Sequence, residues 1–431
     1  MNRKFNNIIE EFKWREYLKD FTPNADSLLI KEKITCYNGF DPTAKSLHIG
    51  NLIPILGLQR LQNYGHTPIV IIGGGTGMIG DPSGRADERK LLTNDQIKDN
   101  IIGIKSQLEN FLDFENKKNP AKIINNSDWL SKINLIEFLR DTGKFFNLNN
   151  MMNKDSVKNR ISRDEGISFT EFSYQLLQAY DFLYLFENYN CTFQMGGSDQ
   201  WGNIVAGVDL IRKKNSNNKN KAHGITYPLL TTANGEKFGK SVTGAITLDP
   251  EVTIPYKIFQ YFYNSSDEEV LKYIKLFTDI SIDDYEELEK STIESPFKRE
   301  AQYFLGKEIT RIIHGDKGMN NALRQTEGLN KGNWKVLIEE DYQDLYKGSE
   351  ENSQLSRKEL IKGISLQQIS VNYGLCNSLA ESKRLISQGG ISLNGEKITE
   401  IEKNISVTDL KANQIIIISK GKKNHKIIKV D

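Results

Sequence analysis

Polar side chains that could bind a phosphate follow the stretch 34–40, whose composition is typical of a β-strand. A turn with a proline interrupts that stretch, and Ser46 can cap the helix predicted to follow. Unpaired N–H groups and the positive end of the dipole make a helix N-terminus a site for anions. Thr43 and His48 flank this site and can each donate a hydrogen bond to a phosphate, and Gly50 leaves room for a flat base on the helix backbone. An ordinary strand-to-helix turn with a surface histidine also fits these residues.

A second group of polar side chains lies on one stripe of an otherwise apolar helix, predicted over 172–187. Tyr174, Gln178 and Asp181 stand at i, i+4 and i+7, so they share one face of that helix. A buried carboxylate is costly unless the protein or a polar ligand supplies partners. Asp181 could therefore accept a hydrogen bond from a ligand hydroxyl in an aromatic pocket, and Tyr37 could reach the same point from the first strand. A purely structural polar network is the alternative.

Basic side chains that could neutralise a polyphosphate lie in two loops. Lys237 and Lys240 are three residues apart, beside two glycines in the loop 234–244. Such a loop could close over a polyphosphate and stabilise the charge that develops on a leaving pyrophosphate. Arg85 and Arg89, after a glycine-rich loop, are further candidates. A solvated basic turn is the alternative for the lysines.

Two glycine-rich stretches resemble nucleotide-binding motifs but lack the required context. Residues 75–80 match G-x-G-x-x-G, yet a second turn follows at 81–84 where a dinucleotide site needs a helix. Residues 235–241 have one residue too few between their glycines for a P-loop. These features argue against a dinucleotide-dependent oxidoreductase and against a P-loop enzyme.

The elements that must position these residues follow from the alternation of strands and helices over 30–215. That alternation predicts an α/β fold, a doubly wound parallel sheet whose ligands bind at the carboxyl ends of its strands. Asp199 and Gln200 follow a predicted strand, so we expect them at that edge. The strands are expected at 34–40, 67–72, 121–125, 191–195 and 226–232.

The pattern changes twice after the sheet, which indicates three domains. We expect a catalytic domain over 1–250, an all-α domain over 251–345, a linker over 346–362 and a small α+β domain over 363–431. In the last domain, Asn394-Gly395 between two short β-type runs predicts a hairpin. That domain carries ten basic and six acidic side chains, which fits a region that touches a polyanion.

Composition excludes several classes of protein. The 431 residues include 57 basic and 56 acidic side chains, so the net charge of +1 provides no overall field toward nucleic acid or membrane. The three cysteines are far apart, which disfavours a disulfide framework or a structural zinc and suggests a reducing compartment. We see no signal peptide or membrane span, and we expect a cytoplasmic protein. No Ser-His-Asp group or metal-ligand cluster stands out, which suits a reaction whose nucleophile is already charged.

Several blocks, in this order, resemble a known family. His48-Ile49-Gly50-Asn51 is similar to the first signature of class I aminoacyl-tRNA synthetases, and Lys237-Phe238-Gly239-Lys240-Ser241 is similar to the second. Together with the other blocks, they make the chain resemble the bacterial-type tyrosyl-tRNA synthetases nearly from end to end. Residues 363–431 are similar to a small α-L RNA-binding motif. The other blocks are YNGFDPT, GGGTGMIGDPSGR, SFTEFSYQLLQAYDF and MGGSDQWGN.

The resemblance implies a Rossmann-like catalytic domain and a role for each matching residue. Tyrosine's phenol would bond to Tyr37 and Asp181, its ammonium group to Asp81, Tyr174 and Gln178, and Asn126 and Gln200 would help to hold it. The ATP and adenylate site would comprise Asp41, His48, Gly50, Asn51, Gly197, Asp199 and Lys240. The catalytic group, which holds the polyphosphate, would comprise Thr43, His48, Arg85, Arg89, Lys237 and Lys240.

The resemblance also implies substrates and partners. These are L-tyrosine, ATP as a substrate with Mg²⁺, and tRNA(Tyr), with the domain 251–345 on the anticodon arm. A homodimer is implied, whereas no tightly bound cofactor, protein-held metal or membrane partner is expected. Asn51, Asn38 and Phe238-Gly239 depart from residues common in the family. A tryptophan-specific relative and an RNA-binding protein of the same fold without aminoacylation remain the alternatives.

Overall fold

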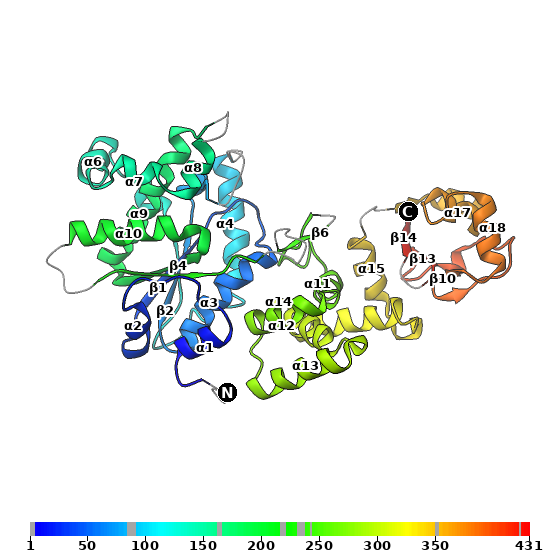
Figure 1. Ribbon diagram of the computed structural model, residues 1–431. Coiled ribbons are helices and arrows are strands. Elements are labelled where there is room, and N and C mark those ends of the chain that lie inside the picture. Colours follow the sequence, from blue (N-terminus) through cyan, green and yellow to red (C-terminus); the bar gives the residue numbers. More distant parts are fainter. Residues whose placement is uncertain are drawn as a thin grey trace. The chain divides into compact units, whose positions relative to one another are not determined.

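The computed structural model in Figure 1 divides into two compact units, Met1–Gly239 with Lys272–Glu286 and Lys240–Leu271 with Glu287–Asp431. The structure describes residues 5–83, 92–161, 166–215, 221–230, 238–241, 244–349, 353–421 and 424–431. No helix among these residues has both the length and the apolar character needed to cross a membrane.

The first unit contains a parallel five-stranded sheet with the order β3-β2-β1-β4-β5. Its strands are β1 (Thr35–Phe40), β2 (Thr67–Ile72), β3 (Lys122–Asn125), β4 (Cys191–Gly197) and β5 (His223–Tyr227). The predicted doubly wound sheet is confirmed, and the strand order reverses between β1 and β4. The last strand was placed too late in the sequence. It ends at Tyr227 because Pro228 follows, and proline cannot donate to a sheet ladder.

Helices between these strands supply the core that holds the sheet edge in place. The long helix α9 (Phe169–Tyr189) buries Phe182 and Leu185 completely against a cluster that includes Tyr37 of β1. It exceeds the predicted 172–187 at both ends, since Ser168 caps it and Asn190 terminates it in the left-handed conformation. The other helices of this unit include α1 (Ile8–Trp14), α2 (Ala25–Lys31), α3 (Leu52–Asn63), α4 (Asn94–Leu108), α5 (Ser127–Leu130), α6 (Leu135–Asp141), α7 (Leu148–Met152), α8 (Asp155–Ile161) and α10 (Trp201–Lys214).

The described elements of 251–345 are helical, as the sequence pattern predicts. Within the second unit, α11 (Pro255–Tyr263) packs against α14 (Glu300–Leu329), which bends at Gly315 with φ 66° and ψ −175°. The helix α15 (Glu339–Lys347) follows. Two helices, α12 (Asp267–Phe277) and α13 (Ile282–Glu294), each contribute residues to both units.

The C-terminal sheet has the order β11-β10-β13-β14-β8, with β8 (Ser353–Leu355), β10 (Ile391–Leu393), β11 (Glu396–Lys397), β13 (Ile415–Lys420) and β14 (Asn424–Val430). The predicted hairpin is confirmed, since Asn394 and Gly395 have φ of 47° and 86° between paired strands β10 and β11. The helices α17 (Leu366–Asn372) and α18 (Leu379–Ser387) complete this part.

The expected linker 346–362 differs from what the structure contains. Strand β8 (Ser353–Leu355) pairs in parallel with β14, and α16 (Arg357–Lys362) follows it. Leu355 is 2% exposed within the C-terminal core, so the folded domain begins at least ten residues before 363. The polar composition of this segment gave no sign of a strand. The short strand is stabilised by pairing with residues more than 70 positions later.

Candidate active site

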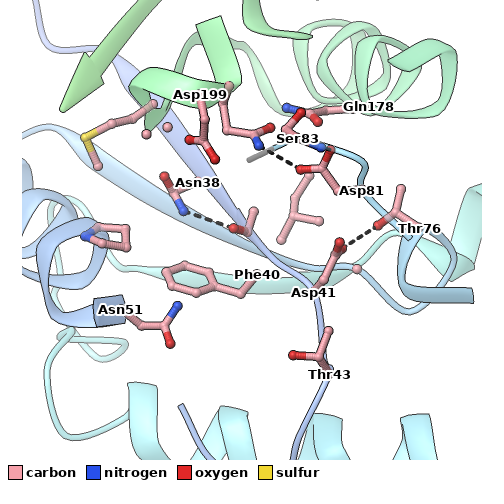
Figure 2. A pocket seen from close by; sticks show the side chains of 18 of the residues that line it. Asn38, Phe40, Asp41, Thr43, Asn51, Thr76, Asp81, Ser83, Gln178 and Asp199 are labelled. Carbon is pink, nitrogen blue, oxygen red and sulfur yellow. Dashed lines mark hydrogen bonds between the residues drawn. The ribbon is translucent and has the colours of Figure 1, made fainter. Parts of the chain in front are cut away.

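A cavity of about 400 Å³ opens at the carboxyl ends of β1 and β4, where the strand order reverses (Figure 2). Ligands of doubly wound sheets bind at this kind of reversal. The cavity joins the predicted anion-binding turn to the polar stripe of α9. Its lining includes these predicted residues: Tyr37, Asp41, Thr43, His48, Gly50, Asn51, Asp81, Asn126, Tyr174, Gln178, Asp181, Gly197, Asp199 and Gln200.

The predicted basic side chains lie outside what the structure describes, so their roles stay predictions. Arg85, Arg89 and Lys237 lie outside the residues that the structure describes. Lys240 begins the two-residue strand β6 (Lys240–Ser241), for which the backbone alone is described.

The turn at the cavity's edge is capped by His48 rather than by Ser46. His48 Nδ1 accepts a hydrogen bond from Gly50 N at 3.0 Å, and Asn51 Oδ1 accepts one from His48 N at 3.0 Å. Ser46 instead donates to the carbonyl of Leu47 at 2.8 Å. A Cβ added at Gly50 would lie 2.8 Å from the His48 ring, so the glycine is required by the cap itself.

Asp181 lies at the closed end of the cavity and is 3% exposed. Its two carboxylate oxygens accept hydrogen bonds from Asn126 Nδ2 at 2.9 Å and Trp129 Nε1 at 2.7 Å. Burial raises the pKa of Asp181 to about 7, and these two donors oppose that rise. Asp41 adds a smaller upward contribution to the pKa. Near neutral pH this carboxylate is therefore poised between its two protonation states.

Tyr37 contributes a second polar atom to the same end of the cavity. Its Oη is buried and has no hydrogen-bond partner within the described part of the chain. Burial, followed by the charge of Asp181, raises the pKa of this phenol well above its usual value, so the hydroxyl remains a donor. A buried unpaired hydroxyl costs about 1–3 kcal/mol. A ligand hydroxyl that bonds both side chains would remove that cost.

Asp81 forms another polar point of the lining. Its carboxylate accepts from Gln200 Nε2 at 2.7 Å and from the backbone N–H of Ser83 at 2.9 Å (Figure 2). Asn203 Nδ2 donates to Gln178 Oε1 at 3.1 Å and to Gln200 Oε1 at 3.2 Å, which fixes both amides. The result is a rigid group of acceptor oxygens that suits a cationic ligand group.

Asp41 connects the two ends of the site. It accepts hydrogen bonds from Tyr174 Oη at 3.0 Å and from Thr76 Oγ1 at 2.9 Å. Thr76 Oγ1 in turn accepts from Asn126 Nδ2 at 2.9 Å, and that amide also bonds Asp181. A continuous network therefore links Asp41 to the closed end of the cavity. The contact between Tyr174 and Asp41 joins two residues for which the resemblance implies different ligand groups.

Sequence reasoning missed Trp129, Thr76 and Gln194. Gln194 is 3% exposed on β4, where it is the register partner of Tyr37, and its Oε1 lacks a hydrogen-bond partner among the described residues. A polar residue inside an apolar strand was a signal that could have found it. No comparable signal marked Trp129, because its partner Asp181 lies 52 positions away.

Two family models match the chain. The first, described as tRNA synthetases class I (W and Y), matches residues 30–330. The second, described as the tyrosine–tRNA ligase SYY-like C-terminal domain, matches residues 351–428. This second match begins within the segment expected as a linker and agrees with the position of β8.

Relatives of the chain agree with these matches. It is 44% identical over 424 residues to the tyrosine–tRNA ligase of Roseiflexus castenholzii, covering 98% of this chain and 99% of that protein. Identity to tyrosine–tRNA ligase 1 of Bacillus subtilis is 45% over 424 residues, with the same two coverages of 98% and 99%. A C-terminally truncated mitochondrial tyrosyl-tRNA synthetase of Aspergillus nidulans superimposes with a TM-score of 0.68 at 31% identity, covering 76% of this chain and 95% of that one. The chain therefore belongs to the class I tRNA synthetases of the tryptophan and tyrosine group, and within it to the tyrosine–tRNA ligase family.

Proposed function

We propose that the chain activates L-tyrosine with ATP and then transfers the tyrosyl group to tRNA(Tyr). In the first step the tyrosine carboxylate attacks the α-phosphorus of ATP, which gives tyrosyl-adenylate and releases pyrophosphate. In the second step a hydroxyl of the terminal ribose of the tRNA attacks the tyrosyl carbonyl, and AMP leaves. The observation that carries the proposal is one cavity that holds both the capped turn at His48 and the buried Asp181.

We propose that the closed end of the cavity binds the phenol hydroxyl of the substrate. The substrate hydroxyl would donate to Asp181 and accept from Tyr37, whose Oη has no partner among the described residues. Trp129 and Asn126 hold the carboxylate in place and leave lone pairs for the substrate. Tryptophan offers an indole N–H but no oxygen to accept from Tyr37, so the same pair favours tyrosine.

The acceptor group around Asp81 is the proposed site of the substrate ammonium. Gln178 and Tyr174 complete it, as the family resemblance implies, and Gln200 supports it through its hydrogen bond to Asp81. Asn126 would help to hold the substrate from the other end, where it bonds Asp181. With its two ends held, the tyrosine would direct its carboxylate toward the turn that carries His48. Such positioning can supply several kcal/mol of the activation barrier.

The capped turn and the residues around it are the proposed ATP site. Thr43 and His48 would bind the terminal phosphates, Gly50 would lie under the adenine, and Asn51, Asp41, Gly197 and Asp199 would contact the adenylate. Arg85, Arg89, Lys237 and Lys240 would neutralise the leaving pyrophosphate. Within the described ranges, no three metal-ligating side chains gather in a way that could hold an ion. We propose that Mg²⁺ enters bound to ATP, whose phosphates are its usual ligands.

The remaining domains are proposed to bind tRNA(Tyr). The helices of 251–345 would contact the anticodon arm, and the C-terminal domain would contact another part of the same molecule through its excess of basic residues. A cytoplasmic location is part of the same proposal.

We also propose that the chain forms a homodimer through exposed apolar side chains of residues 135–161 and 166–169. Seven large apolar side chains of these ranges are exposed, and exposed apolar surface marks an interaction site in many proteins. An aspartate in place of Phe169, which is 78% exposed, is expected to give a monomer, because a charge buried in an interface is costly. Light scattering would measure the mass. The exposed apolar residues are Leu135, Ile136, Leu139, Leu148, Met152, Ile161 and Phe169.

The matched control for this variant is Phe297→Asp, since Phe297 is 82% exposed and lies outside those ranges. Its mass should equal that of the parent. A parent that is itself monomeric at micromolar concentration, or a dimeric Phe169→Asp variant, would contradict the proposed interface.

The affinity for tyrosine is expected to fall as the pH drops below 7. The pKa of Asp181 is raised to about 7, so acid protonates the carboxylate, removes its charge and weakens the acceptor of the phenol. Below that value the affinity should fall by about tenfold per pH unit, because binding then requires loss of one proton. Equilibrium dialysis with labelled tyrosine between about pH 5 and about pH 8 would measure it. Phenylalanine is the control ligand, and an equal slope for both ligands would refute the assignment.

Tyrosine-dependent exchange of pyrophosphate into ATP is the test of the proposed function. We expect exchange with tyrosine, and much weaker exchange with tryptophan or phenylalanine. Absence of exchange with every amino acid, together with RNA binding, would favour the non-catalytic alternative. Stronger exchange with tryptophan than with tyrosine would favour a tryptophan-specific enzyme.

A further inference from the structure

Within the second signature block, the structure describes the side chain of Phe238, which stands between Lys237 and Lys240 in the sequence. Phe238 N donates a hydrogen bond to the carbonyl of Leu230 at 3.3 Å. The two residues that bracket the segment 231–237 are therefore joined directly. Phe238 is itself 7% exposed, so this junction is buried.

The ring of Phe238 packs on two aromatic residues of α12. Its centroid is 5.3 Å from that of Phe277, with an angle of 17° between the planes, and 5.0 Å from that of Tyr273 at 55°. Phe277 and Tyr273 are 0% and 3% exposed. We call these three residues the aromatic anchor. Aromatic pairs of this kind contribute about 0.5–1.5 kcal/mol beyond the burial of their area.

The end of α12 that carries this anchor is held by two buried arginines. Arg15 Nη1 donates to the carbonyls of Lys275 at 2.9 Å and Thr278 at 2.7 Å, and Arg60 Nη2 donates to that of Leu276 at 2.9 Å. Guanidinium groups at a helix C-terminus satisfy carbonyls that have no partner within the helix. Arg15 and Arg60 are 2% and 3% exposed, so Phe277 and Tyr273 belong to a rigid platform.

The backbone of Phe238 and Gly239 also lies against the capped turn at His48. A Cβ added at Gly239 would lie 3.1 Å from Ile49 Cγ1 and 3.4 Å from Gly50 N, and its φ of +89° also favours glycine. A Cβ at Gly50 would lie 3.7 Å from the carbonyl oxygen of Phe238. The backbone of Phe238 and Gly239 is therefore fixed between α12 and the turn proposed to bind ATP.

We infer that Phe238 is a positioning residue for adenylate formation. The aromatic anchor holds Phe238 and Gly239, the two residues between the signature lysines in the sequence, beside the His48 turn. Electrostatic stabilisation of a leaving group requires donors that are already in position. Without the phenyl ring, the segment that carries the donors must become ordered during the reaction, and this ordering has an entropic cost. The inference rests on the proposed function, because it concerns the rate of the same first step.

The test uses the full chain with Phe238→Ala and Phe238→Met. The alanine variant should form tyrosyl-adenylate at least about tenfold more slowly at saturating tyrosine and ATP, since positioning of charged groups contributes factors of this size or more. Its dissociation constant for tyrosine should stay within about twofold of the parent, because the aromatic anchor does not touch the closed end of the cavity. Methionine keeps apolar bulk and sulfur–aromatic contacts, so it should restore most of the rate.

Phe259→Leu is the matched control, since Phe259 is 0% exposed and stacks on Tyr263 with centroids 5.6 Å apart in the second unit. It should keep the parental rate per active site. If Phe238→Ala does not fold, Phe238→Val replaces it, with a smaller loss of rate because valine keeps part of the apolar bulk. A parental single-turnover rate in Phe238→Ala, or equal losses of rate and tyrosine affinity in that variant, would overturn the inference. Absence of exchange in the parent would instead refute the proposed function.

Discussion

An Asp181→Ala variant is expected to lose most of its preference for tyrosine over phenylalanine. In the parent, phenylalanine would leave the buried carboxylate of Asp181 and the buried hydroxyl of Tyr37 without the substrate partner. Sites that bond a substrate hydroxyl reject the analogue without it by about 10⁵-fold, a magnitude known from tyrosyl-tRNA synthetases themselves and not obtained from this chain. The ratio of kcat/KM for the two amino acids in pyrophosphate exchange would measure the loss.

Asp181→Asn is the second variant needed, because alanine also removes an acceptor from Asn126 and Trp129. The asparagine keeps the volume and one acceptor oxygen but loses the charge. We expect it to lie between alanine and the parent in selectivity, with tyrosine affinity no longer dependent on pH near 7. Thermal unfolding would separate lost stability from lost recognition. If Asp181→Ala still discriminates as the parent does, the phenol is read elsewhere.

The edge of the sheet that bears the site could be predicted from the sequence because most residues of its central strands are buried. Thr67–Ile72 was predicted with its observed bounds, and Thr35–Phe40 differs from the prediction by one residue. Continuous apolar runs bounded by proline, glycine or polar residues identify such strands. Once the strand ends are known, the rule for parallel sheets brings Asp41, Asn126 and Asp199 to one edge.

Contacts between distant parts of the chain set the limits of that prediction. Ser46 was expected to cap the helix, but Gln107 of α4 bonds the backbone N–H of Leu47 at 2.9 Å and lies 3.3 Å from Ser46 Oγ. The cap then falls to His48, two residues later. A residue about 60 positions away therefore determines which of these two side chains caps the helix, and rules based on neighbouring residues cannot predict this.

The same limit explains the polar network around Asp181. Both hydrogen bonds to the Asp181 carboxylate join residues more than 50 positions apart, so spacing along one helix could indicate the carboxylate but not its donors. The anchor of Phe238 on α12 is of the same kind, since both its ring partners lie more than 30 positions later. Local patterns thus indicated which groups carry the chemistry, and tertiary packing determined what holds them.

Removing both signature lysines is expected to give the second large effect. A Lys237→Ala, Lys240→Ala double variant should form tyrosyl-adenylate at least about 10²-fold more slowly, because the charge that develops on the leaving pyrophosphate loses two cations. The dissociation constant for tyrosine should be unchanged, since the closed end of the cavity is lined by Asp181 and Tyr37 and needs no cation. The rate would be measured in single-turnover experiments, in which the release of labelled pyrophosphate reports formation of the adenylate.

The matched control is Lys98→Ala on α4, where the side chain is 74% exposed and pairs with Asp95 at 3.6 Å. It removes the same group from a surface position and should leave the rate unaltered. Replacing both signature lysines by arginine keeps the charge and should recover part of the loss, because the longer planar group differs in geometry. If the double alanine variant reacts at the parental rate, the leaving group is neutralised by other residues, and Arg85 and Arg89 would then carry that role alone.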